Sequence, residues 1–241
     1  MSMDESKLNE FVERARKAAG ENLEAVILFG SAASGDYEEG FSDLNLFCLV
    51  RDSSAKSLHA LGDVAKWWAK QKQPPPQVMT RAELENSVDV FTIELMDMQQ
   101  HHRVLFGNDV FQRLEIPLDR HRVQLEYELR EKTLLLRQEF LLASGRDKVL
   151  WELMLHSLPS FLTLFRHALI AMGKPSTQAR RDALQTLGTH LGFDPAVMLA
   201  LLDVRQNKNK RGNFDAHDLF SKYLAVIEKV TNAVDAIGPK R

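Results

Sequence analysis

The first hundred residues alternate between stretches with helical spacing of apolar positions and short apolar runs. Residues 4–19 show the helical spacing and end at Gly20, and residues 53–71 show it again before three prolines. A capping-box pattern that starts at Thr80 predicts a further short helix. Runs of apolar and β-branched residues predict strands at 24–29, 43–50, 76–80 and 88–98. This order of elements predicts a mixed α/β unit.

After residue 120 the pattern becomes helical throughout. We expect helices at residues 125–142, 151–172, 177–191, 195–204 and 215–236. The second of these is expected to be interrupted or kinked near Pro159. Glycine or proline stands in most of the gaps between these expected helices, so we expect short loops. Helices joined by short loops pack as antiparallel neighbours, which predicts a helical bundle. The sequence therefore predicts an α+β protein, with a mixed-sheet domain at residues 1–117 and a helical bundle domain at residues 118–241.

Candidate chemistry lies where two of the expected strands begin and end. The apolar run of residues 26–29 stops at Gly30, where the backbone can approach a ligand closely. The next expected strand carries Asp43 and Asn45 near its start, two residues apart and therefore on one face. Burying such groups without partners costs a few kcal/mol, and a bound metal ion would supply a partner.

Composition narrows the classes of function. Hydrophobic residues make up 44% of the 241 residues and charged residues 27%, as in ordinary soluble domains. The net charge of −2 gives no support for a nucleic-acid partner, because general duplex binders carry a basic excess. Cys48 is the single cysteine, which excludes a disulfide framework and favours a reducing, cytoplasmic compartment. We expect neither a signal peptide nor a membrane span, since no apolar run approaches the required roughly 20 residues.

The motif Gly30-Ser31, a spacer and then Ser42-Asp43-Leu44-Asn45 resembles that of the nucleotidyltransferase superfamily. This is the fold of DNA polymerase beta and of the kanamycin and streptomycin nucleotidyltransferases. The similarity covers roughly residues 25–107, and the helical half is similar only in architecture. The resemblance implies that Gly30, Ser31 and Ser42 bind a nucleotide. It also implies Mg²⁺- or Mn²⁺-dependent transfer of a nucleoside monophosphate, by default AMP, from an NTP to a small-molecule or protein acceptor.

The resemblance also implies the metal ligands. In the family two carboxylates lie on the second strand and a third on a neighbouring strand, so we expect Asp43, Asn45 and Glu94 to bind metal. Asp43 and Glu94 are then the catalytic residues. Asp89 is the competing candidate for the third carboxylate, and Asp97 is a weaker one.

Asn45 departs from the family pattern, in which this position is a carboxylate. An amide oxygen can coordinate Mg²⁺ but brings no charge, so the expected set has a charge of about −2 rather than about −3. The alternative interpretation is therefore a catalytically impaired nucleotide-binding or antitoxin-like module. A purely structural interpretation is that Asp43 caps a turn and that Asn45 bonds to a neighbouring backbone group.

Several histidines admit both a structural and a functional interpretation. His101, His102 and Arg103 fit a helix surface or a helix end better than a reactive cluster. On the helix at 151–172, His156 and His167 fit partly buried histidines better than a metal or acceptor site.

The basic loop that starts at Arg205 offers phosphate contacts, with a solvated loop as the default interpretation. Arg211 and His217 also fit the loose Arg–His pattern of HEPN ribonucleases, which makes RNA cleavage a further alternative. The apolar helical half supplies a candidate homodimer surface.

Overall fold

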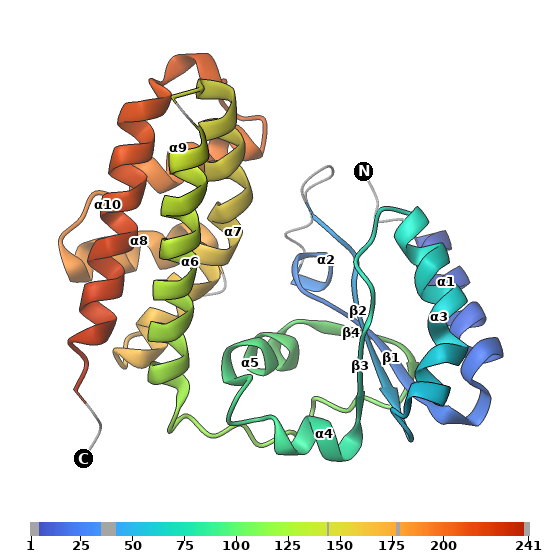
Figure 1. Cartoon of the computed structure of the whole chain (residues 1–241). Helices are drawn as coiled ribbons and strands as arrows, with labels where there is room; N and C mark the ends of the chain where they lie inside the picture. Colours follow the sequence, from blue (N-terminus) through green and yellow to red (C-terminus); the bar gives the residue numbers. More distant parts are fainter. Residues whose placement is uncertain (1–4, 35–41, 144, 177–178, 239–241) are drawn as a thin grey trace. The chain divides into compact units, whose positions relative to one another are not determined.

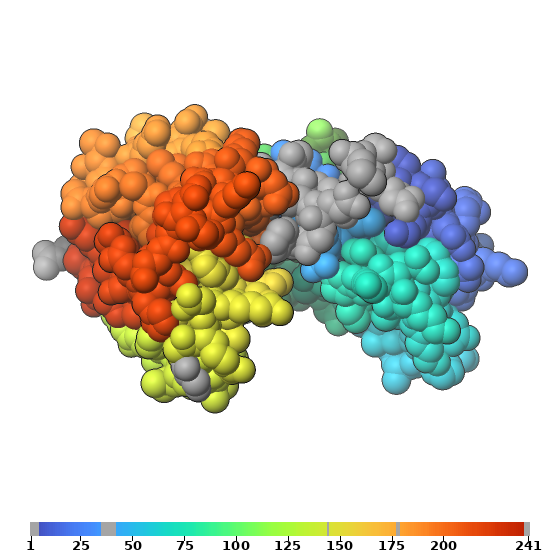
Figure 2. Space-filling model, turned by 90° about the horizontal axis from the view of Figure 1, so that it is seen from above, coloured from blue at the N-terminus to red at the C-terminus, as the bar shows by residue number. Residues whose placement is uncertain are grey.

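The computed structural model describes residues 5–34, 42–143, 145–176 and 179–238. The chain divides into two compact units, Met1–Leu118 and Asp119–Arg241. Figures 1 and 2 colour the first unit from blue to green and the second from yellow-green to red.

The N-terminal unit is built on a four-stranded mixed sheet with the strand order β3-β2-β1-β4. β1 pairs antiparallel with β2 and β4, and β2 pairs parallel with β3. The elements in chain order are α1 (Glu5–Ala19), β1 (Leu23–Phe29), α2 (Ser31–Ser34), β2 (Asn45–Val50), α3 (Ala55–Lys70), β3 (Gln77–Thr80), α4 (Arg81–Asn86), α5 (Thr92–Gln100) and β4 (His102–Gly107). The predicted mixed sheet is confirmed, as is the capping box of Thr80 and Glu83 at the start of α4.

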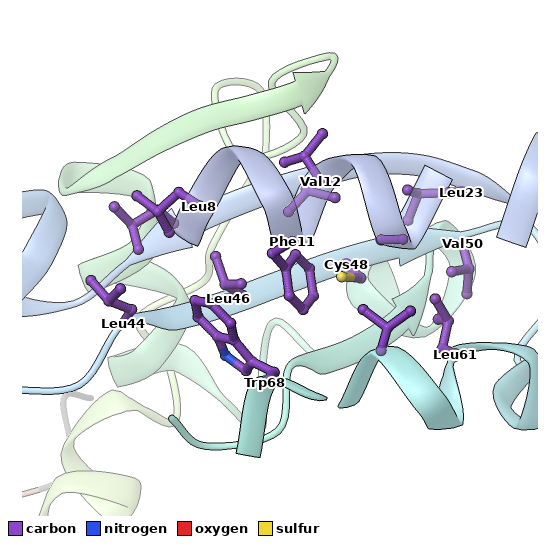
Figure 3. Packing of buried hydrophobic residues seen from close by; sticks show 14 of the residues in the cluster. Leu8, Phe11, Val12, Leu23, Leu44, Leu46, Cys48, Val50, Leu61 and Trp68 are labelled. Atoms are coloured by element: carbon purple, nitrogen blue, oxygen red, sulfur yellow. The ribbon is translucent and has the colours of Figure 1, made fainter. Parts of the chain in front are cut away.

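Helices α1 and α3 cover one face of the sheet (Figure 1). Phe11 of α1 and Trp68 of α3 meet edge to face, with their ring centroids 5.1 Å apart. Both side chains lie over Leu46 and Cys48 of β2, whose alternate residues point into this cluster (Figure 3). Cys48 is fully buried, and burial raises the pKa of its thiol to about 12.

Helices α4 and α5 cover the other face of the sheet. Leu84 of α4 and Leu95 and Met98 of α5 pack against Ile27 of β1 and Phe47 of β2. Strands β1 and β2 are thus buried on both faces, which explains why they appear in the sequence as continuous apolar runs rather than as alternating ones.

The predicted strand at residues 88–98 is wrong. Residues 87–90 form a turn, and α5 begins at Thr92, whose hydroxyl donates to the carbonyl of Val88 at 3.0 Å. A short apolar run can be a buried strand or a buried helix, and periodicity alone does not separate the two. The glutamate, leucine, methionine and glutamine side chains of α5 are good helix formers, and they outweigh the β-branched start of the run.

The fourth strand lies at residues 102–107, where the sequence predicted a helix surface or helix end. His101 does end α5, as its C-terminal cap, but His102 opens β4. On β4, Arg103 forms a two-bond ion pair with Glu5 of α1, with N–O distances of 2.8 and 3.0 Å. This pair joins the sheet to the first helix.

The C-terminal unit is a bundle of helices, as predicted. Within its described residues the helices are α6 (His121–Ala143), α7 (Asp147–Ala171), α8 (Arg180–Leu191), α9 (Ala196–Arg205) and α10 (Ala216–Asp235). Residues 177–178, where the predicted third helix of this half begins, lie outside the described residues, as does residue 4 of the predicted first helix of the chain. α7 packs against the other four helices and continues through Pro159 without a break.

Helix α7 is long and apolar enough to cross a membrane by length and composition alone, with a mean hydropathy of 1.2 over an 18-residue window. However, 61% of that window is buried inside the bundle. Its residues Leu150, Met154, Leu158 and Leu169 are completely buried. These properties are those of the core helix of a soluble bundle.

Candidate nucleotide site

The Gly30 turn joins β1 to α2. Gly30 has φ +75°, a left-handed conformation that favours glycine. Its carbonyl accepts hydrogen bonds from the N–H groups of Ala33 at 2.9 Å and Ser34 at 3.1 Å, which closes the single turn of α2. The backbone therefore reverses immediately after the sheet, and the N–H groups of Ser31 and Ala32 begin a helical turn, where such groups have no partner within the helix.

Asn45 lies directly beside this turn. In the antiparallel pairing of β1 and β2 it stands opposite Phe29, one residue before the glycine. A Cβ atom added to Gly30 would lie 3.1 Å from Nδ2 of Asn45. The glycine is thus required by its backbone conformation and also by the half-buried amide that covers it.

Asp43 stands two residues before β2 and is exposed to solvent. The backbone at this point is fixed, because the N–H of Leu44 donates to Oε1 of Gln73 at 2.7 Å. The Leu44 side chain is 2% exposed and joins the α1–α3 cluster. Successive residues of a strand point to opposite faces, so Asn45, which precedes Leu46 of the α1–α3 cluster, points toward the face covered by α4 and α5.

The strands beside β1 and β2 carry no carboxylate: β3 reads QVMT and β4 reads HRVLFG. On the face that holds Asn45 they present an amide and an imidazole instead. Gln77 of β3 pairs with Phe47 in the parallel register and is exposed. His102 of β4 pairs with Phe29, which in turn pairs with Asn45. Sequence reasoning did not single out Gln77 and gave His102 a structural role, because strand pairing decides which side chains become neighbours and the sequence does not give that pairing.

His102 is held on both sides of its ring. Its Nδ1 lies 2.7 Å from the carbonyl oxygen of Met98, and its Nε2 lies 2.9 Å from Oδ2 of Asp109. Both partners accept, so the ring donates to both only when each nitrogen carries a proton. Burial acts to raise the pKa of Asp109, but hydrogen bonds from His102 and from the Gln112 and Phe111 N–H groups outweigh it, and the pKa is lowered.

The predicted third carboxylate, Glu94, lies in the first turn of α5 and not on a strand. It is half-buried, and α5 covers the sheet face on which Asn45 lies. Asp97 is half-buried on the same helix, and Asp89 is half-buried in the turn before it. Any contribution of these acids to the site therefore comes from α5 and the turn before it, and not from a neighbouring strand.

The described residues contain no group of three or more His, Cys, Asp or Glu side chains that could hold a metal ion. The set predicted from the sequence has only two acids, Asp43 and Glu94, with the amide of Asn45. Mg²⁺ usually keeps several water ligands and is held by one or two carboxylates together with the phosphates of the substrate. The residues around Asp43 therefore fit an ion that arrives with a nucleotide, and not an all-protein metal cage.

The histidines of α7 differ in environment. His156 is exposed, whereas His167 is fully buried and its Nδ1 lies 2.8 Å from Nε2 of His121 on α6. The guanidinium of Arg166, which can only donate, lies 3.4 Å from Nε2 of His167. This places His167 among buried, partnered histidines, and the two histidines of the helix do not share one environment.

The basic residues at the end of α9 and after it lie in separate environments. Arg205 is 5% exposed and its Nη1 donates to the carbonyl of Leu155, so it is a core residue and not a solvated loop residue. Arg211 lies over the ring of Trp151, 6.0 Å from its centroid. His217 approaches the carbonyl of Gly145, with Nε2 at 3.2 Å.

Comparison with known proteins agrees with this geometry. Residues 6–98 match the family model of the nucleotidyltransferase domain, and this match covers α1 to α5. The crystal structure of spectinomycin adenyltransferase AAD(9) from Enterococcus faecialis with ATP and spectinomycin is similar over 96% of this chain and 99% of that chain. The TM-score is 0.61 and the identity 14%, so this likeness shows the fold. The N-terminal unit belongs to the nucleotidyltransferase superfamily.

Two further solved structures are similar over a smaller part of the chain. A toxin–antitoxin structure with AMP-PNP covers 42% of this chain and 74% of that chain, at 16% identity and a TM-score of 0.30. A mutant of the toxin–antitoxin MntA-HpeT covers 44% of this chain and 74% of that chain, at 16% identity and a TM-score of 0.28. Both scores are too low to support an argument about function. No curated protein matches the chain.

Proposed function

We propose that this protein binds a nucleoside triphosphate, ATP by default, with Mg²⁺ or Mn²⁺ at the Gly30 end of the sheet, and that its capacity for nucleotidyl transfer is greatly weakened. The N–H groups and hydroxyl of the Gly30-Ser31 turn contact the triphosphate, with Ser42 beside them. Asp43 holds the metal ion that accompanies the phosphates, and Asn45 adds a neutral oxygen ligand. We also propose that the protein is cytoplasmic and that it binds neither a membrane nor nucleic acid.

The observation that carries this proposal is the chemistry of the sheet face next to Asp43. Nucleotidyl transfer depends on metal ions that neutralise charge on the phosphoryl oxygens, and such ions need carboxylates that converge on one point. On this face the second strand presents Asn45 and the adjacent strand presents Gln77. Two amides in place of acids leave phosphate binding possible but remove the charge that would hold a second metal ion.

The chain's own residues support binding through their geometry. The Asn45 side chain lies against Gly30 and keeps the turn close to β2, so the turn and Asp43 stay on the same end of the sheet. When bound, Mg²⁺ would neutralise phosphate charge. The protein contributes the position of the turn and the exposed carboxylate of Asp43.

A second candidate function is active transfer of AMP from ATP to a small-molecule or protein acceptor. One observation favours it: Glu94, half-buried on α5, lies in the layer that covers the face holding Asn45. A carboxylate that approaches from this helix would be the second acid of the site beside Asp43, in the role of the family's third carboxylate. The likeness to an enzyme solved with ATP and spectinomycin supports a small-molecule acceptor for this candidate.

Incorporation of an α-labelled NTP with Mg²⁺ or Mn²⁺ separates the two candidates. We expect little or no transfer by the wild type, and a gain in the Asn45→Asp and Gln77→Glu double variant, which rebuilds the acids on β2 and β3. Asp63→Asn is the control, because Asp63 is 96% exposed on α3. Efficient transfer by the wild type that disappears in both Asp43→Ala and Glu94→Gln would establish the enzyme instead.

A further inference from the structure

The segment that follows β4 leads from the sheet to the second unit, and it is drawn in green in Figure 1. Residues 108–118 are all described and form no helix or strand. Val110 and Phe111 are nonetheless buried, in the cluster that α4 and α5 form with the sheet. The first unit ends at Leu118, so we call residues 108–118 the connecting segment.

Asp109 ties the connecting segment to β4. Its Oδ1 accepts the N–H groups of Phe111 at 3.0 Å and Gln112 at 3.1 Å, which fixes a turn in the segment. Its Oδ2 lies 2.9 Å from Nε2 of His102, the first residue of β4. The Phe111 ring also packs edge to face on the imidazole, with the ring centroids 5.4 Å apart. One carboxylate therefore fixes the local shape of the segment and also its attachment to the sheet.

The second ring nitrogen of His102 caps helix α5. Its Nδ1 lies 2.7 Å from the carbonyl oxygen of Met98, one of the last four carbonyls of that helix. Such carbonyls lack a helical donor, and the partial negative charge of the helix end favours a cation beside them. Carbonyl and carboxylate oxygens only accept, so both contacts are hydrogen bonds only when the ring is an imidazolium. The side chain is 12% exposed, so water does not simply replace a bond that is lost.

The groups around the ring favour this charged form. Among the residues that the structure describes, Asp109 is the acid within ion-pair distance of His102. The apolar Phe29 is its partner on β1, and α5 contributes an uncharged main-chain carbonyl. The next residue of β4, Arg103, points to the opposite face, where it pairs with an acid of α1. The charge that faces His102 is therefore negative.

We propose that His102 is a proton-dependent latch, a side chain that holds the connecting segment on the sheet only in its charged form. The imidazolium joins Asp109 to the end of α5. In either neutral tautomer a lone pair faces one of the two oxygens, so the ring leaves its position and the bridge between them opens.

The direction of the pH dependence follows from this exchange of a proton. The attached segment binds a proton that the released segment does not, so attachment weakens as the pH rises. Histidine is the side chain that ordinarily changes its charge between about pH 5 and 8, which suits a change in this range. Release frees the stretch of chain that leads to the helical bundle. The inference does not depend on the nucleotide site.

Hydrogen exchange of the full chain at about pH 5 and about pH 8.5, on either side of the histidine range, tests the latch. The reporters are the N–H groups of Phe111 and Gln112, which donate to Asp109. The pKa of Asp109 is lowered, so its carboxylate is charged at both pH values. After correction for intrinsic exchange rates, we expect protection to fall about tenfold or more at the higher pH, as for one charge-assisted hydrogen bond. Equal protection at both pH values would overturn the proposal.

Two substitutions identify the titrating group. His102→Gln removes the ring and keeps an amide donor, so protection of the two N–H groups should no longer depend on pH. His59→Gln is the matched control, because His59 is exposed on α3 and its loss should leave the pH dependence unchanged. A fall in protection that persists in His102→Gln would assign the effect to another group and overturn the proposal.

The ring itself gives a test that needs no substitution. Nitrogen-15 NMR of histidine side chains distinguishes the imidazolium from the two neutral tautomers. We expect two ring N–H groups on His102 at about pH 5 and one at about pH 8.5. A neutral His102 at the lower pH, with Phe111 and Gln112 still protected, would contradict the latch.

Discussion

The guanidinium of Arg205 donates to the main-chain carbonyl of Leu155, the carbonyl that Pro159 leaves without a helical donor. In an α-helix the N–H of residue 159 would bond to the carbonyl of residue 155, and proline has no N–H. Arg205 comes from α9 and is 5% exposed, with its Nη1 at 2.5 Å from the oxygen. This bond gives the freed carbonyl a partner inside the bundle, and it gives the buried Arg205 guanidinium an acceptor.

A double-mutant cycle tests this relationship. Arg205→Met leaves the Leu155 carbonyl buried and unpaired, which costs about 1–3 kcal/mol of unfolding free energy. Pro159→Ala restores the helical donor, so in that background Arg205→Met should cost less. Urea unfolding of the four proteins gives the coupling energy. A cost that is the same in both backgrounds would mean that Arg205 does not compensate for the proline.

Replacing Gly30 tests the packing of the nucleotide turn. Gly30→Ala forces an L-residue to φ +75° and places its Cβ 3.1 Å from the Asn45 amide, so we expect a loss of about 1–2 kcal/mol. Gly62→Ala is the control, because its Cβ meets no atom within 4 Å in the interior of α3. That change should stabilise the protein by about 0.5–1 kcal/mol. Equal effects of the two substitutions in thermal unfolding would contradict this account of the turn.

The Asp109 carboxylate should make stability depend on pH. Its pKa is lowered in the folded protein, so it stabilises the fold above its ordinary value of about 3.9 and the contribution is lost as the pH falls below it. Asp109→Asn removes the charge facing His102 and should cost about 1–2 kcal/mol at neutral pH.

The stability difference between the wild type and Asp109→Asn should shrink toward pH 3. Asp63→Asn, on the exposed surface of α3, should show no such difference. A stability difference between the wild type and Asp109→Asn that stays constant with pH would show that the carboxylate charge does not cause the loss of stability.

Cys48 should be chemically inert in the native state. Its pKa is raised to about 12 by burial, and the side chain has no exposed surface, so neither the thiolate nor access is available at pH 8. We expect no reaction with a thiol reagent over the time in which the urea-unfolded chain reacts completely. Rapid labelling of the native protein would mean that the sheet opens between α1 and α3.

The sequence predicted most of the fold because its apolar patterns are strong. The helices of the second half and strands β1, β2 and β3 appear within a few residues of their predicted places. The prediction of a strand at residues 88–98 failed because the apolar run is short and its pattern fits both a strand and a helix. Its helix-forming residues become decisive when α5 packs on the sheet. β4 was missed because its polar start, His102, is stabilised by Asp109 and Met98 rather than by an apolar face.

The candidate site was predictable only in part. Gly30, Asp43 and Asn45 lie close together along the chain, at adjacent ends of two antiparallel strands. The sequence motif was therefore enough to predict that they are neighbours. Gln77 and His102 join the same face through strand pairing, which depends on long-range contacts. Glu94 was chosen as the third carboxylate because its segment was predicted to be a strand, and in the structure this segment is the helix α5.

Calorimetric titration with ATP in the presence of Mg²⁺ tests the central claim most directly. We predict a saturable binding isotherm for the wild type, a loss of affinity of at least tenfold in Asp43→Ala, and an unchanged isotherm in Asp63→Ala. Binding should also weaken when Mg²⁺ is chelated. No heat of binding by the wild type, or equal affinity in Asp43→Ala, would contradict a nucleotide site at this end of the sheet.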